Sequence, residues 1–136
     1  MRRVGVQRIN NQKNKRKNEK ITIILLFDKS FFFIIMKIEF LGHAGVCIST
    51  EQTRIVMDGW FSKNGAFDAS WYQFPANHYY MENDWSDLTA VIVSHEHMDH
   101  LDPEFLSKIP EHIPIYIPKY PSPNLLKKIK FLTNKI

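Results

Sequence analysis

A short apolar run ends directly in a cluster of metal-ligating side chains, and this junction constrains the fold more than any other feature. Residues 90–93 read Ala-Val-Ile-Val, as expected of a strand buried on both faces. Residues 94–100 follow at once and read Ser-His-Glu-His-Met-Asp-His. Asp102 and Pro103 then predict a helix start, with Asp as the N-cap and Pro at the first helical position. A buried strand, a turn and a helix in this order indicate a layered α/β architecture.

The side chains of the turn have the spacing of metal ligands. His95 and His97 are two residues apart, so an extended backbone would project both to one side, where they can share a metal ion. The following turn can direct Asp99 and His100 to a neighbouring position. Imidazole and carboxylate ligands suit Zn²⁺, and Fe or Mn are also possible. The pattern matches by chance with odds on the order of one in a thousand, so we favour a metal site over a polar surface cluster.

The remaining sequence predicts strands before the motif and mixed elements after it. Alternation of polar and apolar residues predicts a strand at residues 37–41, and the turns around residues 46–49 and 54–58 predict two more, so we expect three short strands in an antiparallel meander. After the motif we expect two helices and one strand: residues 103–108, 124–132 and 113–117. Between them, residues 60–88 contain every Trp of the chain and lack a clean period. Their aromatic side chains either form a lid over a substrate or cover the sheet.

The first 35 residues differ from the rest in charge. They hold nine Lys or Arg and two acids, a net of +7, whereas residues 36–136 hold nine and twelve, a net of −3. The basicity therefore belongs to this segment, and we expect no nucleic-acid partner for the body. We interpret residues 1–35 as an extension outside the domain, with the true start at Met36, and residues 36–136 as the domain.

Two further features bear on localisation. The apolar pieces of residues 21–27 and 31–36 are shorter than the about 20 residues that span a bilayer, so membrane association is not expected. A membrane-tethered metal-binding module that uses residues 21–36 remains the weakest alternative. The single cysteine, Cys47, excludes an internal disulfide and favours a reducing compartment, which predicts a cytoplasmic protein.

The pattern His-x-His-x-Asp-His at residues 95–100 resembles the signature of the metallo-β-lactamase-fold hydrolases. The opening Phe-Leu-Gly-His-Ala-Gly of residues 40–45 and the strand that ends at Asp58 occupy the places that such domains give them. The resemblance covers residues 36 to about 120. The opening and the aromatic stretch look like the branches that include N-acyl-phosphatidylethanolamine phospholipases and ascorbate-6-phosphate lactonases, which implies a lipid-like or sugar-like small-molecule substrate.

The resemblance implies roles for individual residues. His95 and His97 would bind a first metal ion, and Asp99 and His100 would bind a second and take part in catalysis. Asp58 would hydrogen-bond to the ligands and orient them without coordinating. A metal-bound hydroxide would attack an ester, lactone, amide or phosphodiester. Separately, His43 either lines the mouth of the site or is a structural residue of its turn.

The family fold is an αββα sandwich of two similar halves, and the second half normally supplies a third His, a bridging Asp and a last His. After His100 this sequence has only His112, and residues 36–136 amount to about half of such a fold. We therefore interpret the chain as the N-terminal half of the sandwich, truncated, with weak metal binding and little turnover by itself. The alternatives are an inactive remnant and a subunit completed by a separate C-terminal half or a homo-oligomer.

Overall fold

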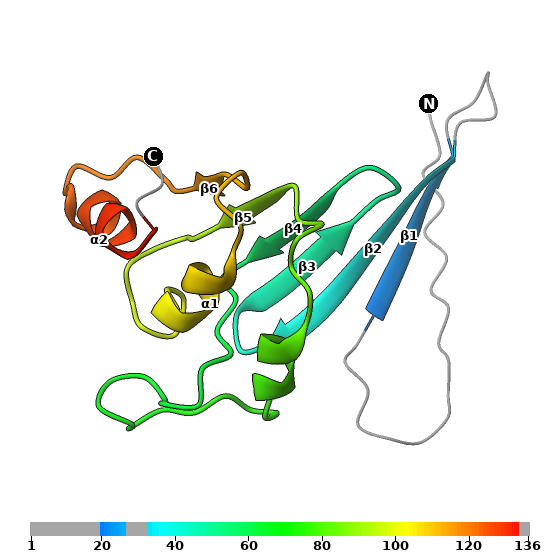
Figure 1. Cartoon of the computed structure of the whole chain (residues 1–136). Helices are drawn as coiled ribbons and strands as arrows, with labels where there is room; N and C mark the ends of the chain where they lie inside the picture. The colour runs from blue at the N-terminus through cyan, green and yellow to red at the C-terminus, as the bar shows by residue number, and fades with distance from the viewer. Residues whose placement is uncertain (1–19, 27–32, 134–136) are drawn as a thin grey trace.

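The computed structural model describes residues 20–26 and 33–133, which form one six-stranded mixed sheet with three helices (Figure 1). The strands are β1 Lys20–Leu26, β2 Phe33–Gly42, β3 Gly45–Ser49, β4 Arg54–Met57, β5 Ala90–Ile92 and β6 Ile115–Tyr116. The helices are the 3₁₀ helix η1 His78–Glu82 and the α-helices α1 Pro103–Lys108 and α2 Asn124–Thr133. The strands lie in the order β1 to β6, and α1 and α2 lie toward the β5–β6 side (Figure 1).

The predicted meander is confirmed. Strands β2, β3 and β4 pair antiparallel, and β5 and β6 extend the sheet in parallel after the long connection that contains η1. Strand β2 is longer than predicted, because it begins at Phe33 and pairs with β1, so residues 20–26 and 33–35 of the expected extension belong to the sheet. The start at Met36 stays a prediction, and residues 1–19 and 27–32 of the extension lie outside the described part.

One apolar cluster joins the sheet to both α-helices. Val91 and Val93 are 1% and 2% exposed, as the apolar run predicts, and they belong to the same cluster as Phe105 of α1 and Ile129 of α2. The layered α/β prediction is therefore confirmed at the level of a mixed sheet with helices; that this is half of a larger sandwich stays a prediction. Among the described residues, no helix has the length and apolar character needed to cross a membrane.

A buried carboxylate fixes α1 against the connection that follows β4. Asp102 caps α1 as predicted, with one oxygen accepting the amides of Glu104 and Phe105 at 3.0 and 3.3 Å. Its other oxygen accepts the amides of Phe61 and Ser62, both at 2.8 Å. The helix start and the chain leaving β4 are thus held together directly beside the motif.

Gly59, which follows Asp58, lies too close to two aromatic rings to carry a side chain. A Cβ atom at Gly59 would lie 2.8 Å from Cε1 of Phe105 and 3.0 Å from Cε2 of Phe61, well inside van der Waals contact. Only the absence of a side chain lets the backbone pass these two rings. A glycine at this position is therefore required by the packing of α1.

Candidate metal centre

The topology brings three separate segments to one edge of the sheet. Val46, at the start of β3, pairs with Met57 at the end of β4, and Met57 pairs with Ile92 at the end of β5. The turn between β2 and β3, the residue after β4 and the loop after β5 therefore meet at the same edge. These segments carry His43, Asp58 and the motif of residues 94–100.

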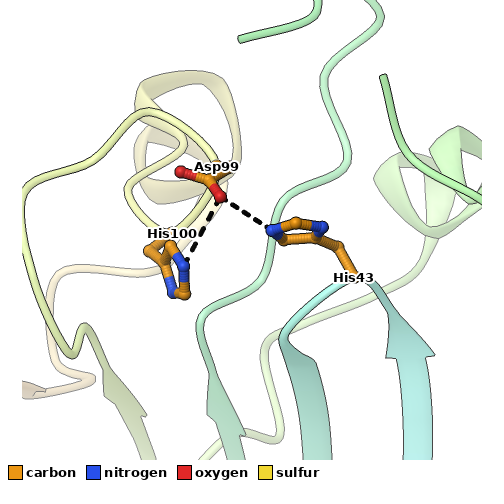
Figure 2. A group of neighbouring side chains, drawn as sticks. All are labelled: His43, Asp99 and His100. Atoms are coloured by element: carbon orange, nitrogen blue, oxygen red, sulfur yellow. Dashed lines mark hydrogen bonds and ion pairs between the residues drawn. The ribbon is translucent and has the colours of Figure 1, made fainter. Parts of the chain in front are cut away.

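His43, Asp99 and His100 form a group that could hold a metal ion. Each offers one ligand atom, and these atoms lie within 4.8 Å of one another. His43 Nε2 is 2.7 Å from Asp99 Oδ2, and His100 Nε2 is 3.5 Å from the same oxygen. Figure 2 shows His43 reaching from the β2–β3 turn toward Asp99 and His100 on the loop after β5. His43 thus faces the site rather than serving only its turn.

The other motif histidines lie beside this group. The His95 ring centroid is 3.9 Å from that of His100 and 4.6 Å from that of His97. His97 also meets the ring of Phe67 at 6.0 Å between centroids. The structure therefore brings the four predicted ligands close together. His43 lies with Asp99 and His100, and the rings of His95 and His97 lie beside this group. Their division between two metal ions stays a prediction.

Asp58 connects β4 to two of these imidazoles. Its Oδ2 lies 2.9 Å from His100 Nδ1 and accepts the Ser94 hydroxyl at 2.6 Å, and its Oδ1 accepts the Ser94 amide at 2.8 Å. The Ser94 hydroxyl in turn lies 2.9 Å from His95 Nδ1. Asp58 is 4% exposed, so water competes little for these bonds. The carboxylate therefore contacts His100 directly and His95 through Ser94, and its role in orienting metal ligands stays a prediction.

Two site residues adopt backbone conformations that side chains seldom take. His43 has φ 52° and Asp58 has φ 49°, both in the left-handed region. Such residues cost about 1–3 kcal/mol each and persist where the surrounding structure imposes them. For Asp58 this constraint includes the hydrogen bond from its amide to Ile92 O at 3.0 Å. Directing these two side chains at the site therefore costs folding free energy, which the rest of the structure offsets.

The electrostatics favour the ligand forms of His95 and Asp99. Burial, and then the neighbouring His100 and His97, lower the pKa of His95, so its neutral form is favoured. Burial would raise the pKa of Asp99, but the hydrogen bond from His43 and the adjacent imidazoles lower it. Asp99 Oδ1 is buried and has no hydrogen-bond partner among the described residues. An unpartnered carboxylate oxygen amid imidazole nitrogens fits a divalent cation.

Sequence reasoning missed Ser94 and Tyr120. Ser94 is the only residue between the buried strand run and the first histidine, and a hydroxyl at that junction was the available signal. The Tyr120 hydroxyl donates to Ser94 O at 2.8 Å, which no local pattern indicated. A cavity of about 560 Å³ opens beside these groups. Its lining consists of His95, Glu96, His97, Tyr120, Pro121, Ser122 and Leu125.

The aromatic residues of the connection divide between the two predicted roles. One set packs in the core: Trp60, Phe61, Tyr80 and Trp85. Another set is exposed: Phe67, Trp71, Tyr72, Phe74 and Tyr79. Of these, Trp71 lies 6.3 Å from the His43 ring, between centroids, and is 53% exposed. The first set therefore packs in the core, which confirms the covering role for these residues. For the second set, the role of a lid over a substrate stays a prediction.

Residues 37–130 match the family described as the beta-lactamase superfamily domain, and the chain belongs to this family. It is 36% identical over 101 residues to a Mycolicibacterium smegmatis protein named as a candidate Rieske 2Fe-2S iron–sulfur protein. It is 35% identical over 101 residues to proteins of the same description in two strains of Mycobacterium tuberculosis. These alignments cover 71% of this chain but 18–19% of the relatives, so the chain spans less than a fifth of their length. No solved structure matches significantly.

Proposed function

We propose that this chain carries one part of the active site of a metal-dependent hydrolase. The observation that carries the proposal is the meeting of three imidazoles and a buried carboxylate at one sheet edge of a beta-lactamase superfamily domain. The unpartnered Asp99 Oδ1 supports a cation at this edge, because a buried carboxylate oxygen without a donor is costly.

Two sets of residues would hold the cations. His95 and His97 would hold one, and Asp99 and His100 would hold the other, with His43 as an additional ligand. The donor set favours Zn²⁺, and Fe or Mn remain compatible with it. When bound, such ions supply Lewis acidity and a strong nucleophile at neutral pH.

The chain's own residues orient the ligands and control protons at the site. Asp58 holds His100 directly, and it is 5% exposed on its side chain, so the imidazole keeps one orientation. His43 Nε2 lies 2.7 Å from Asp99 Oδ2 and keeps that carboxylate facing His100; as a metal ligand, this nitrogen would give up the proton that it donates there. Asp99 Oδ1 has no partner among the described residues and is open to a cation. We propose Asp99 and His100 as the residues nearest the reacting atoms.

The exposed aromatic side chains support a substrate with an apolar or planar part. Trp71 is 53% exposed and faces His43, and Phe67 is 38% exposed and faces His97. A ring face beside a cation site can stack on an acyl chain or a sugar ring. We propose an ester, lactone, amide or phosphodiester with a lipid-like or sugar-like group.

A second candidate is a subunit that requires another polypeptide to complete the site. Catalytic zinc normally has three protein ligands, and within residues 20–26 and 33–133 we assign only His95 and His97 to the first cation. The relatives are about five times longer than the matched segment, which supports a contribution from further residues. The added ligands would come from a separate C-terminal half or from a second copy of this chain.

The relatives' name concerns an iron–sulfur group that this chain does not supply with ligands. A Rieske cluster takes two Cys and two His. This sequence has one cysteine, Cys47, which is 4% exposed within β3. The proposal therefore assigns no iron–sulfur function to this chain.

The test is hydrolysis of p-nitrophenyl acetate and bis(p-nitrophenyl) phosphate by the zinc-loaded chain. We expect slow turnover above that of free zinc, lost in His97→Ala and retained in His112→Ala, because His112 is exposed and lies outside the site. Tight zinc retention without turnover would favour the subunit that needs a partner. Turnover that is unchanged in His97→Ala would reject the proposed site.

A further inference from the structure

We infer that the single carboxylate of Asp58 fixes the tautomers of two imidazoles, that of His100 directly and that of His95 through Ser94, which is a positioning residue. Ser94 stands between all three: its hydroxyl is 2.6 Å from Asp58 Oδ2, 2.9 Å from His95 Nδ1 and 3.5 Å from His100 Nδ1. The consequence for metal binding rests on the proposed function. The tautomers themselves do not depend on it.

Counting protons determines the direction of each bond. A carboxylate only accepts, so the Ser94 hydroxyl gives its one proton to Asp58 Oδ2. Having no second proton, the hydroxyl can only accept from His95, 2.9 Å away. His95 therefore carries its proton on Nδ1, and its Nε2 is a free lone pair.

The same count applies to His100 without an intermediary. Its Nδ1 lies 2.9 Å from Asp58 Oδ2, and because the carboxylate only accepts, His100 Nδ1 is the donor. In a neutral ring Nε2 then keeps its lone pair, and it lies 3.5 Å from Asp99 Oδ2. No proton lies between this nitrogen lone pair and the carboxylate oxygen, so the two repel each other. A cation bound between them would remove the repulsion.

The surrounding backbone keeps Ser94 in this place. The Ser94 amide donates to Asp58 Oδ1 at 2.8 Å, so the two residues share two hydrogen bonds. On its other side the Ser94 carbonyl accepts the Tyr120 hydroxyl at 2.8 Å. Asp58 is itself tied to the end of β5 through Ile92 O. Ser94 is thus held from three directions, and its hydroxyl has one orientation that satisfies all its partners.

The direct test is a long-range ¹H–¹⁵N correlation spectrum of the histidine side chains in the metal-free protein at pH 8.5. In wild type we expect both His95 and His100 as the Nδ1–H tautomer. In Ser94→Ala, His95 should lose this tautomer and His100 should keep it, whereas Ser94→Thr should restore His95. Asp58→Asn should alter both rings. The exposed Ser86→Ala is the control and should change neither.

The wild-type spectrum alone can overturn the inference, because an Nε2–H tautomer for His95 would contradict it even if a variant failed to fold. An unchanged His95 in folded Ser94→Ala would overturn it as well. Zinc titration is the second readout. We expect about 10–100-fold weaker binding for Ser94→Ala, the usual effect of losing a hydrogen bond behind a ligand, and recovery in Ser94→Thr. Failure of wild type to bind zinc would reject the proposed function and leave the tautomer result standing.

Discussion

Replacing Asp102 by Ala tests how the fold holds α1 against the connection that follows β4. The side chain is 1% exposed and accepts four amides, two from the first turn of α1 and two from the connection after β4. Loss of the helix cap costs about 1 kcal/mol. The buried amides of Phe61 and Ser62 lose their partner and cost about 1–3 kcal/mol each. The sum is about 3–7 kcal/mol, against a total of about 5–15 kcal/mol for a domain.

Urea unfolding followed by far-UV circular dichroism measures this loss. The expected change shifts the midpoint by 1 M or more, for a slope of about 1–3 kcal/mol per M. Asp84→Ala is the matched control, because Asp84 also accepts a backbone amide, from Ser86 at 2.8 Å, but is exposed, so its midpoint should hardly move. A loss below about 1.5 kcal/mol for Asp102→Ala would refute the reasoning.

Three further predictions concern packing, pH and the metal. Gly59→Ala should lower the free energy of unfolding by about 1–3 kcal/mol, because its Cβ would meet Phe105 at 2.8 Å; an unchanged melting temperature would contradict this. Burial and the neighbouring imidazoles lower the pKa of His95 in the folded state. The contribution of His95 to the stability of the metal-free protein is therefore present above pH about 6.5, and it is lost as the pH falls through the folded-state pKa. His95→Ala should flatten that part of the stability curve, and an unaltered slope would disprove it. Co²⁺ should quench tryptophan emission, since the Trp60 and Trp71 rings lie 5.3 and 6.3 Å from His43; equal quenching after replacing both by Phe would exclude this position for the ion.

Local rules predicted the elements around the motif well. The apolar run at 90–93, the Asp-Pro helix start and the alternation of residues 37–41 each depend on neighbours in sequence, and the elements they predict appear in the structure. The motif itself also predicted that His95, His97 and His100 lie close together, because its spacing is local. These features needed no knowledge of how distant segments meet.

The parts that sequence could not predict depend on long-range register. His43 and Asp99 are 56 residues apart in the chain. They meet only because the β2–β3 turn lies at the same edge of the sheet as the ends of β4 and β5. The role of Ser94 follows from Asp58, and that contact also crosses the sheet. The aromatic stretch lacks a period because its backbone is irregular, so buried Trp60 and exposed Trp71 were indistinguishable by pattern.

Titration of the metal-free chain with Co²⁺, followed by visible absorption, tests the central claim most directly. We predict saturable ligand-field bands, strongly reduced in His100→Ala and in Asp99→Ala and preserved in His112→Ala. The intensity of the bands reports the coordination number and geometry around the ion. Absence of such bands in the wild-type chain, or bands that persist unchanged when His100 and Asp99 are replaced, would contradict a cation centre at this edge of the sheet.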